Sequence, residues 1–160
     1  MSTTRCGIGY DVHRLAQDRQ LILGGIKIQH ALGLEGHSDA DVLCHAIADA
    51  LLGAIGAGDI GQHFPNTDES IRGISSIQIL ERVAEILRAQ NGRAVNVDAT
   101  LIAEAPKMSP HIPEMRKQIA AAIGINESRV SIKATTNEML GAIGRGEGIA
   151  AMAVASVEVD

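Results

Sequence analysis

The sequence predicts one α/β (α+β) domain over residues 1–160, with a single mixed four-stranded sheet, a small hairpin and helices covering one face. Strand-like segments alternate with helix-like segments along the chain, which favours this class over all-α or all-β. Hydrophobic residues make up 46% of the chain and charged residues 21%, as in a folded domain. No repeat or linker divides the 160 residues, so one core is expected.

Four segments have the composition and alternation of strands. They are Cys6–Val12, Arg93–Glu104, Val130–Ala134 and Gly146–Val159. Glycines in the first segment permit close approach of another backbone. Residues 21–28 divide into two short apolar runs around Gly24 and Gly25, which predicts a hairpin with a two-residue turn.

Three helices are expected between these strands. The first is predicted over 39–55, with Ser38 as its N-cap and Asp39 and Asp41 in its first turn. The second, Ser75–Gln90, has apolar residues on one face, and Gly92 is predicted to end it. The third begins near Pro110 and Pro113 and continues to about residue 123.

Charge and composition exclude two classes of partner. The net charge is −5, basic residues are scattered, and Tyr10 and Phe64 are the only aromatic rings apart from histidine, so no nucleic-acid-binding surface is expected. No apolar run is long enough for a membrane span or signal peptide, which predicts a cytoplasmic protein without membrane contact. A core this poor in large rings also suggests that the chain gains buried area by oligomerising.

A candidate metal site comes from Asp11, His13 and His45. Residues two apart on a strand point to the same face, so Asp11 and His13 can converge, and His45 would arrive from a helix. Two imidazoles and a carboxylate suit Zn²⁺ and leave a fourth position open, as in catalytic zinc sites. Surface or capping histidines are the alternative interpretation.

Other polar groups have both functional and structural interpretations. Asp41, His45 and Asp49 share one helix face. They are either a solvated polar stripe, or Asp49 orients a metal ligand or binds a substrate hydroxyl. His37 and Ser38 precede a helix, where phosphate can bind but where a serine can also simply cap.

The C-terminal third offers further groups of this kind. Thr135, Thr136 and Glu138 follow a strand and could serve phosphate and Mg²⁺, or form an ordinary polar turn. The glycine-rich stretch around Arg145 is neither a Walker A loop nor a dinucleotide fingerprint. Lys107 could bind phosphate or be solvated.

Together these segments resemble the 2-C-methyl-D-erythritol 2,4-cyclodiphosphate synthase family of the non-mevalonate isoprenoid pathway. The matching stretches, in order along nearly the whole chain, are Gly7–His13, His37–Val42 with His45, Asp59–Gly61, Phe64–Asp68, Ala105–Met108, Pro110–Met115, Lys133–Thr136 and Gly144–Gly148. The resemblance implies a homotrimer, whose sheets pack together, with active sites between subunits. It also implies conversion of 4-diphosphocytidyl-2-C-methyl-D-erythritol 2-phosphate to the cyclic diphosphate and CMP.

Site roles follow from the same resemblance. Asp11, His13 and His45 would hold Zn²⁺, His37 and Thr136 would stabilise the transition state, and Glu138 would place Mg²⁺ or Mn²⁺ at the diphosphate. The cytidine end would lie, largely through backbone groups, against Ala103, Glu104, Ala105, Pro106, Lys107, Met108, Ser109 and Thr135. The erythritol pocket would be lined by Asp59, Ile60, Gly61, Phe64, Pro65, Asn66, Thr67 and Asp68. The remaining substrate contacts would be Ser38, Asp49, Asn137, Ala142 and Arg145, the last facing phosphate.

Two positions depart from the family pattern. Ala142 stands where a bulky aromatic residue is frequent, so the resemblance leaves open whether a hydrophobic ligand cavity exists near the trimer axis. Asn66 stands where Asp is also common. A zinc phosphohydrolase using the same ligands, or a trimeric binding protein with structural zinc, are the alternative functions.

Overall fold

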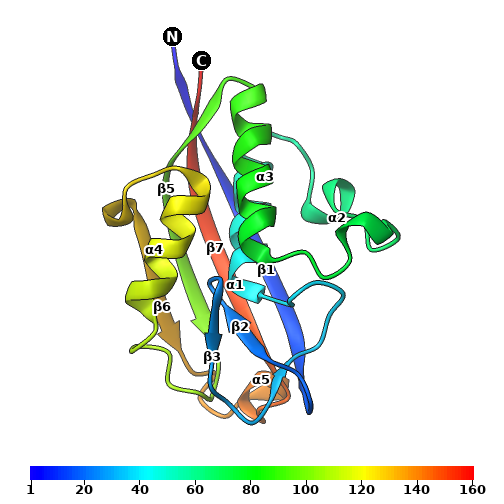
Figure 1. Ribbon diagram of the computed structural model, residues 1–160. Coiled ribbons are helices and arrows are strands. Elements are labelled where there is room, and N and C mark those ends of the chain that lie inside the picture. The colour runs from blue at the N-terminus through cyan, green and yellow to red at the C-terminus, as the bar shows by residue number, and fades with distance from the viewer.

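The computed structural model describes residues 1–160 and has a five-stranded mixed sheet at its centre (Figure 1). The strand order is β4-β1-β7-β5-β6, with β5 and β6 parallel and the other neighbours antiparallel. The strands are β1 (Thr3–Ala16), β4 (Gly33–Leu34), β5 (Gly92–Ile102), β6 (Val130–Thr135) and β7 (Gly148–Val159). The predicted mixed sheet is therefore confirmed.

The predicted count of four strands is wrong, because β4 adds a fifth. This strand has two residues and pairs Leu34 with Leu15 and Gly33 with Ala16 at the end of β1. Two residues carry no alternation of apolar and polar positions, so sequence pattern could not reveal β4. The predicted hairpin is present as β2 (Leu21–Leu23) and β3 (Ile26–Ile28), paired antiparallel.

Three helices cover one face of the sheet (Figure 1). They are α1 (Val42–Ala54), α3 (Ser76–Ala89) and α4 (Ile112–Ile123). Shorter elements connect them: α2 (Ile60–His63), η1 (Glu69–Ile71), η2 (Glu127–Arg129) and α5 (Gly141–Gly144). The core lies between the helices and the sheet and consists mainly of Ala, Leu, Ile and Val, as the composition requires. None of the helices is long and apolar enough to cross a membrane.

The start of α1 differs from the prediction. Asp41 is the N-cap, and Ser38 and Asp39 lie before the helix, because Ala40 (φ 56°) turns the chain there. The Asp41 side chain is fully buried and accepts hydrogen bonds from the backbone N–H groups of Cys44, Gly24 and Gly25 at 3.0, 3.0 and 2.7 Å. Asp41 therefore ties α1 to the hairpin turn and is not part of a solvated stripe.

Glycines in β1 allow α1 to lie directly on the strand. A Cβ atom on Gly9 would lie 1.8 Å from the Ala46 carbonyl oxygen, and one on Gly7 would lie 2.0 Å from that of Ala50. Both positions therefore require glycine, which confirms the predicted close approach. This packing brings His45, the neighbour of Ala46, next to the strand that carries Asp11.

The end of α3 also differs from the prediction. The helix ends at Ala89, and Asn91 (φ 55°), not Gly92, adopts the left-handed conformation that follows it. Gly92 is the first residue of β5. Asparagine tolerates the left-handed region better than most residues, so the chain can turn without glycine at this point.

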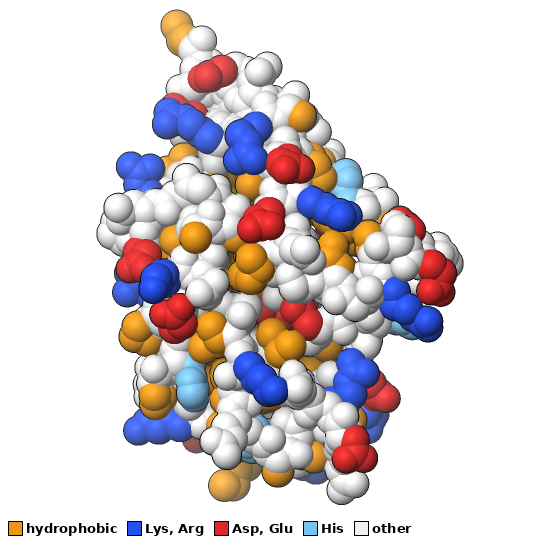
Figure 2. All heavy atoms as spheres, viewed as in Figure 1, with side chains coloured by type: hydrophobic (Ala, Val, Ile, Leu, Met, Phe, Trp, Pro, Cys, Tyr) orange, Lys and Arg blue, Asp and Glu red, His pale blue; other side chains and the backbone are white.

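The opposite face of β1 and β7 has no helix over it. Ile8, Tyr10 and Val12 alternate with the residues that face α1, and Val154 and Met152 pair across from Ile8 and Tyr10. These five side chains are between 45% and 67% exposed. On the helix-covered face, basic and acidic side chains are interspersed, with no continuous patch of either sign (Figure 2).

Candidate metal and phosphate site

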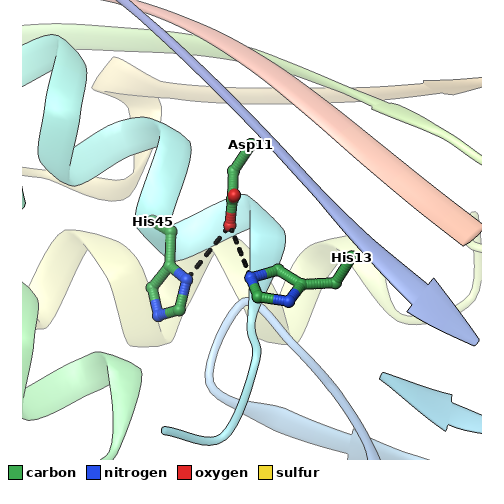
Figure 3. Close-up of side chains that lie close together, drawn as sticks. All are labelled: Asp11, His13 and His45. Atoms are coloured by element: carbon green, nitrogen blue, oxygen red, sulfur yellow. Dashed lines mark hydrogen bonds and ion pairs between the residues drawn. The ribbon is translucent and has the colours of Figure 1, made fainter. Parts of the chain in front are cut away.

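Asp11, His13 and His45 converge on one point (Figure 3). Asp11 Oδ2 lies 3.2 Å from His13 Nε2 and 3.1 Å from His45 Nδ1. Asp11 and His13 come from the same side of β1, and His45 comes from the first turn of α1, where its N–H donates to the Asp41 carbonyl at 3.0 Å. The predicted convergence is therefore confirmed.

Second contacts orient each of these side chains. His13 Nδ1 lies 2.5 Å from the Glu35 carbonyl oxygen, which can only accept, so Nδ1 donates and Nε2 faces the cluster. His45 Nε2 lies 3.3 Å from Ser38 Oγ, which leaves Nδ1 toward Asp11. Asp11 Oδ1 accepts from the Val12 N–H at 3.0 Å, and Oδ2 is the oxygen that faces the two imidazoles. Such outer contacts are typical of built metal sites.

The electrostatics of the cluster are strongly coupled. Burial alone would raise the pKa of Asp11, but hydrogen bonds and charge from His13 and His45 outweigh it and hold that pKa well below its ordinary value. The hydrogen bond to Asp11 raises the pKa of His13, against the opposing effect of burial. An ionised carboxylate between two imidazoles is thus the favoured state of the site.

The donor set fits a divalent cation. One carboxylate oxygen and two imidazole nitrogens lie within 4.8 Å of one another. Zinc bonds to such atoms are about 2.0–2.2 Å long, so small side-chain movements would place all three around one ion. The identity of the metal does not follow from this geometry alone.

The cluster opens into a cavity of about 340 Å³. Four carboxylates line it, those of Asp11, Asp49, Asp68 and Glu69, and Arg72 is the only lysine or arginine in the lining. A phosphorylated ligand entering this cavity would meet net negative charge. The cavity therefore needs a bound cation if it is to accept such a ligand.

Most residues of the predicted erythritol pocket line this cavity. They are Ile60, Gly61, Phe64, Pro65, Asn66 and Asp68. His37, Ser38 and Asp49, for which other roles were predicted, line the cavity as well. Thr67 and Asp59 do not, and the Asp59 carboxylate instead accepts from the Gln62 N–H at 3.0 Å as the N-cap of α2. His37 and Ser38 lie five and four residues before α1, so a phosphate at this point would not contact the helix N-terminus that the sequence predicts.

Asp49 has a specific structural contact. Its Oδ1 accepts from the Ile60 N–H at 2.7 Å, which joins α1 to the loop at the cavity wall. Burial raises the pKa of Asp49, and the charges of Asp59 and Asp11 add to that effect. Its other carboxylate oxygen is free to contact a ligand.

Six cavity residues were not predicted from the sequence. They are Gly36, Glu69, Ile71, Arg72, Ile74 and Ile79. A Cβ atom on Gly36 would lie 3.0 Å from His13 Cε1, so glycine at this position leaves room for the His13 imidazole. Its place just before His37 could have indicated that Gly36 belongs to the site. Glu69, Ile71, Arg72 and Ile74 belong to η1 and the residues after it, whose sequence resembles an ordinary polar loop, and Ile79 lies on the buried face of α3.

The remaining predicted residues lie in a second region. Ala103–Ser109 follow β5, and Thr135–Glu138 lie at and after the end of β6, near α5 in Figure 1. None of them lines the cavity described above, and neither do Ala142 and Arg145. Met108 and Ala103 are buried, whereas Lys107, Thr136 and Glu138 are exposed. Arg145 pairs with Glu147 at 2.7 Å.

Comparison with known proteins identifies the family. The model of the YgbB family matches residues 4–158. The chain belongs to the YgbB family. A 2-C-methyl-D-erythritol 2,4-cyclodiphosphate synthase of Alkaliphilus metalliredigens is 58% identical over 153 residues, which cover 96% of each chain. The synthase of Thiobacillus denitrificans is 57% identical over 158 residues and 99% of each chain.

Solved structures agree with this assignment to the YgbB family. The bifunctional IspDF of Campylobacter jejuni superposes with a TM-score of 0.95 at 36% identity, and the match covers 100% of this chain but 43% of that longer one. A CDP complex of Plasmodium falciparum IspF gives a TM-score of 0.83 at 34% identity, covering 96% of this chain and 95% of the other. The resemblance is confirmed, and this YgbB family member is a cyclodiphosphate synthase, a lyase of isoprenoid biosynthesis, with a group of side chains that could hold a metal ion.

Proposed function

We propose that this chain converts 4-diphosphocytidyl-2-C-methyl-D-erythritol 2-phosphate to 2-C-methyl-D-erythritol 2,4-cyclodiphosphate and CMP, with Zn²⁺ held by Asp11, His13 and His45. The convergence of these three side chains at the wall of an acidic cavity carries the proposal. Zinc suits two nitrogens and one oxygen with a fourth position left for the substrate. When bound, the metal would neutralise charge on a phosphate oxygen.

The reaction needs no nucleophile from the protein. An oxygen of the substrate's own 2-phosphate forms a bond to the phosphorus nearer the erythritol, and the bond from that phosphorus to the CMP oxygen breaks. Because the attack is intramolecular, holding the two phosphates together supplies much of the acceleration. The cavity residues from Ile60 to Asp68 would hold the erythritol part and exclude water.

The cytidyl end is assigned to the second region. The Plasmodium falciparum relative was solved as a CDP complex, which supports a cytidine nucleotide as the ligand class. Residues 103–109 with Thr135 would hold the nucleotide, largely through backbone groups, and Glu138 offers an exposed carboxylate for Mg²⁺ or Mn²⁺ at the diphosphate. Thr136 and His37 would donate to oxygens on which charge develops. Arg145 is exposed beside this region and would pair with phosphate.

A homotrimer would complete the site. Within one chain the cavity and the second region do not share a lining, although one substrate must reach both. The exposed apolar face formed by Ile8, Tyr10, Val12, Met152 and Val154 supplies a surface on which copies could pack. We expect size-exclusion with light scattering to give three chains, and Tyr10→Asp to lose both assembly and activity. An active Tyr10→Asp monomer would contradict this assignment.

The test of the reaction is ³¹P NMR of the protein with the cytidyl substrate, Zn²⁺ and Mg²⁺. We expect the two coupled signals of a cyclic diphosphate together with CMP. Inorganic phosphate in place of the cyclic product would indicate a zinc phosphohydrolase. An unchanged spectrum from metal-loaded protein would leave a binding protein with structural zinc. A cytoplasmic location stays a prediction.

A further inference from the structure

Two loops leave the carboxyl ends of the parallel strands β5 and β6 and lie against each other. The ladder ends with Ile102 opposite Thr135, and the Ala103 N–H donates to the Thr135 carbonyl at 3.0 Å. Beyond this point the first loop continues through 103–109 and the second through 136–140. Ligands of mixed and parallel sheets commonly bind at this edge, which makes the contact between the two loops relevant to function.

One side chain connects the two loops beyond the ladder. Glu104 Oε1 accepts from the Asn137 N–H at 3.0 Å and from the Met139 N–H at 3.2 Å. Glu104 is half-buried, whereas every residue from 136 to 140 is exposed. Hydrogen bonds to a charged acceptor are stronger than neutral ones, so this carboxylate is the main anchor of the second loop.

The anchored segment has an uncommon backbone conformation. Glu138 (φ 52°) and Met139 (φ 60°) are consecutive non-glycine residues in the left-handed region. Side-chain-bearing L residues avoid this region, so surrounding contacts must maintain it. The two N–H groups that donate to Glu104, those of Asn137 and Met139, lie on either side of Glu138. The Glu138 N–H itself donates to Thr136 Oγ1 at 3.2 Å.

The conformation of this loop sets the direction of two functional groups. Thr136 Oγ1 lies 3.4 Å from Glu138 Oε1, so the hydroxyl and the carboxylate point toward the same place. Without an acceptor for the N–H groups of Asn137 and Met139, the turn would relax and separate them. A displacement of about 1 Å at a reacting centre can reduce the rate about 100-fold.

We infer that Glu104 is a positioning residue, whose carboxylate holds Thr136 and Glu138 in their working geometry and joins their loop to the nucleotide-binding loop. This inference rests on the proposed function, because the roles of Thr136 and Glu138 are assigned there. Glu104 was predicted from the family pattern as a substrate contact. Its Oε1 accepts from the chain's own backbone, so the side chain acts on the substrate through the second loop.

Two substitutions separate this role from direct contact. Glu104→Gln keeps a carbonyl oxygen that can accept both N–H groups, so we expect kcat within about 5-fold of wild type. Glu104→Ala removes the acceptor, and we expect kcat to fall about 100-fold with a smaller change in KM. Zinc content should stay the same in both variants. Glu81→Ala, an exposed carboxylate on α3, is the matched control and should change neither parameter.

Hydrogen exchange of the peptide covering 136–140 provides a readout that does not depend on turnover. The amides of this peptide should be protected in wild type and in Glu104→Gln, and should exchange at least about 10-fold faster in Glu104→Ala. If cyclisation fails in wild type, the exchange result still tests the anchor, so failure of the proposed function is distinguishable.

Two results would overturn the inference. Equal exchange in wild type and Glu104→Ala would mean that the carboxylate does not hold the loop. A Glu104→Gln variant as impaired as Glu104→Ala, with protection intact, would mean that the negative charge binds metal or substrate directly.

Discussion

The cluster of Asp11, His13 and His45 and the loop after β6 contrast in how they hold their functional groups. Asp11, His13 and His45 are half-buried or buried, and they lie where the backbones of β1 and α1 are in direct contact. Thr136 and Glu138 are exposed and rely on hydrogen bonds within and between loops. The first group is positioned by close packing and the second by a polar anchor, so the two should respond to different changes.

The largest expected effect is the loss of a cluster ligand. His45→Ala should remove zinc and lower turnover by roughly 1,000-fold or more, because a metal that neutralises phosphate charge supplies several kcal/mol. The fold should persist, since the substitution shortens a side chain at the cavity wall. Metal analysis together with circular dichroism checks this outcome. Zinc retained at full occupancy would refute the ligand assignment.

Disturbing the packing under the cluster should affect stability next. Gly9→Ala places a Cβ atom 1.8 Å from the Ala46 carbonyl oxygen, so α1 must move away from β1. We expect a loss of about 3 kcal/mol in unfolding free energy and weaker zinc binding. Thermal or urea unfolding measures the first and metal titration the second.

Gly53→Ala is the matched control for that substitution. Gly53 lies in α1, the helix that packs on Gly9. A Cβ atom on Gly53 would have its nearest neighbour, the Ile8 carbonyl oxygen, at 3.9 Å. Alanine should stabilise α1 by about 0.5–1 kcal/mol. If both glycine variants behaved alike, close packing would not be what positions the cluster.

Metal addition should also distinguish the two regions. Zn²⁺ at 100 times its dissociation constant should stabilise the protein by about 2.7 kcal/mol, because three ligands are already assembled. Mg²⁺ alone should produce no comparable shift, since Glu138 is a single exposed carboxylate, but it should stabilise the protein further when CDP is present. Calorimetric melting with each combination is the measurement. If Mg²⁺ without nucleotide stabilised the protein as much as Zn²⁺ does, the two regions would not differ in how they bind metal.

The smallest effect concerns a donor in the exposed loop. Thr136→Ala should lower kcat by about 10- to 100-fold with zinc still bound and the melting temperature nearly unchanged, because it removes a donor and no ligand. Thr135→Ala, whose hydroxyl donates to the Thr136 carbonyl at 3.2 Å, is the comparison variant and should have the milder effect. An unchanged rate in Thr136→Ala would exclude this hydroxyl from the mechanism.

Much of the cluster could be predicted because its determinants are local. Asp11 and His13 lie on one face since strand side chains alternate, and the β1 glycines indicated a close neighbour. The start of α1 could not be predicted in this way. Asp41 displaces Ser38 as the cap because its carboxylate meets the hairpin turn and Ser76 Oγ, which are distant in sequence.

The sequence by itself determined the convergence of Asp11, His13 and His45, the mixed sheet with helices on one face, and the family. These depend on residue type, on side-chain periodicity and on motifs that follow one another along the chain. Only the tertiary structure decided that β4 adds a fifth strand, that Arg72 and Glu69 border the cavity, and that Glu104 holds the loop of Glu138. These features arise where segments far apart in sequence share hydrogen bonds or a surface, and no local pattern records such contacts.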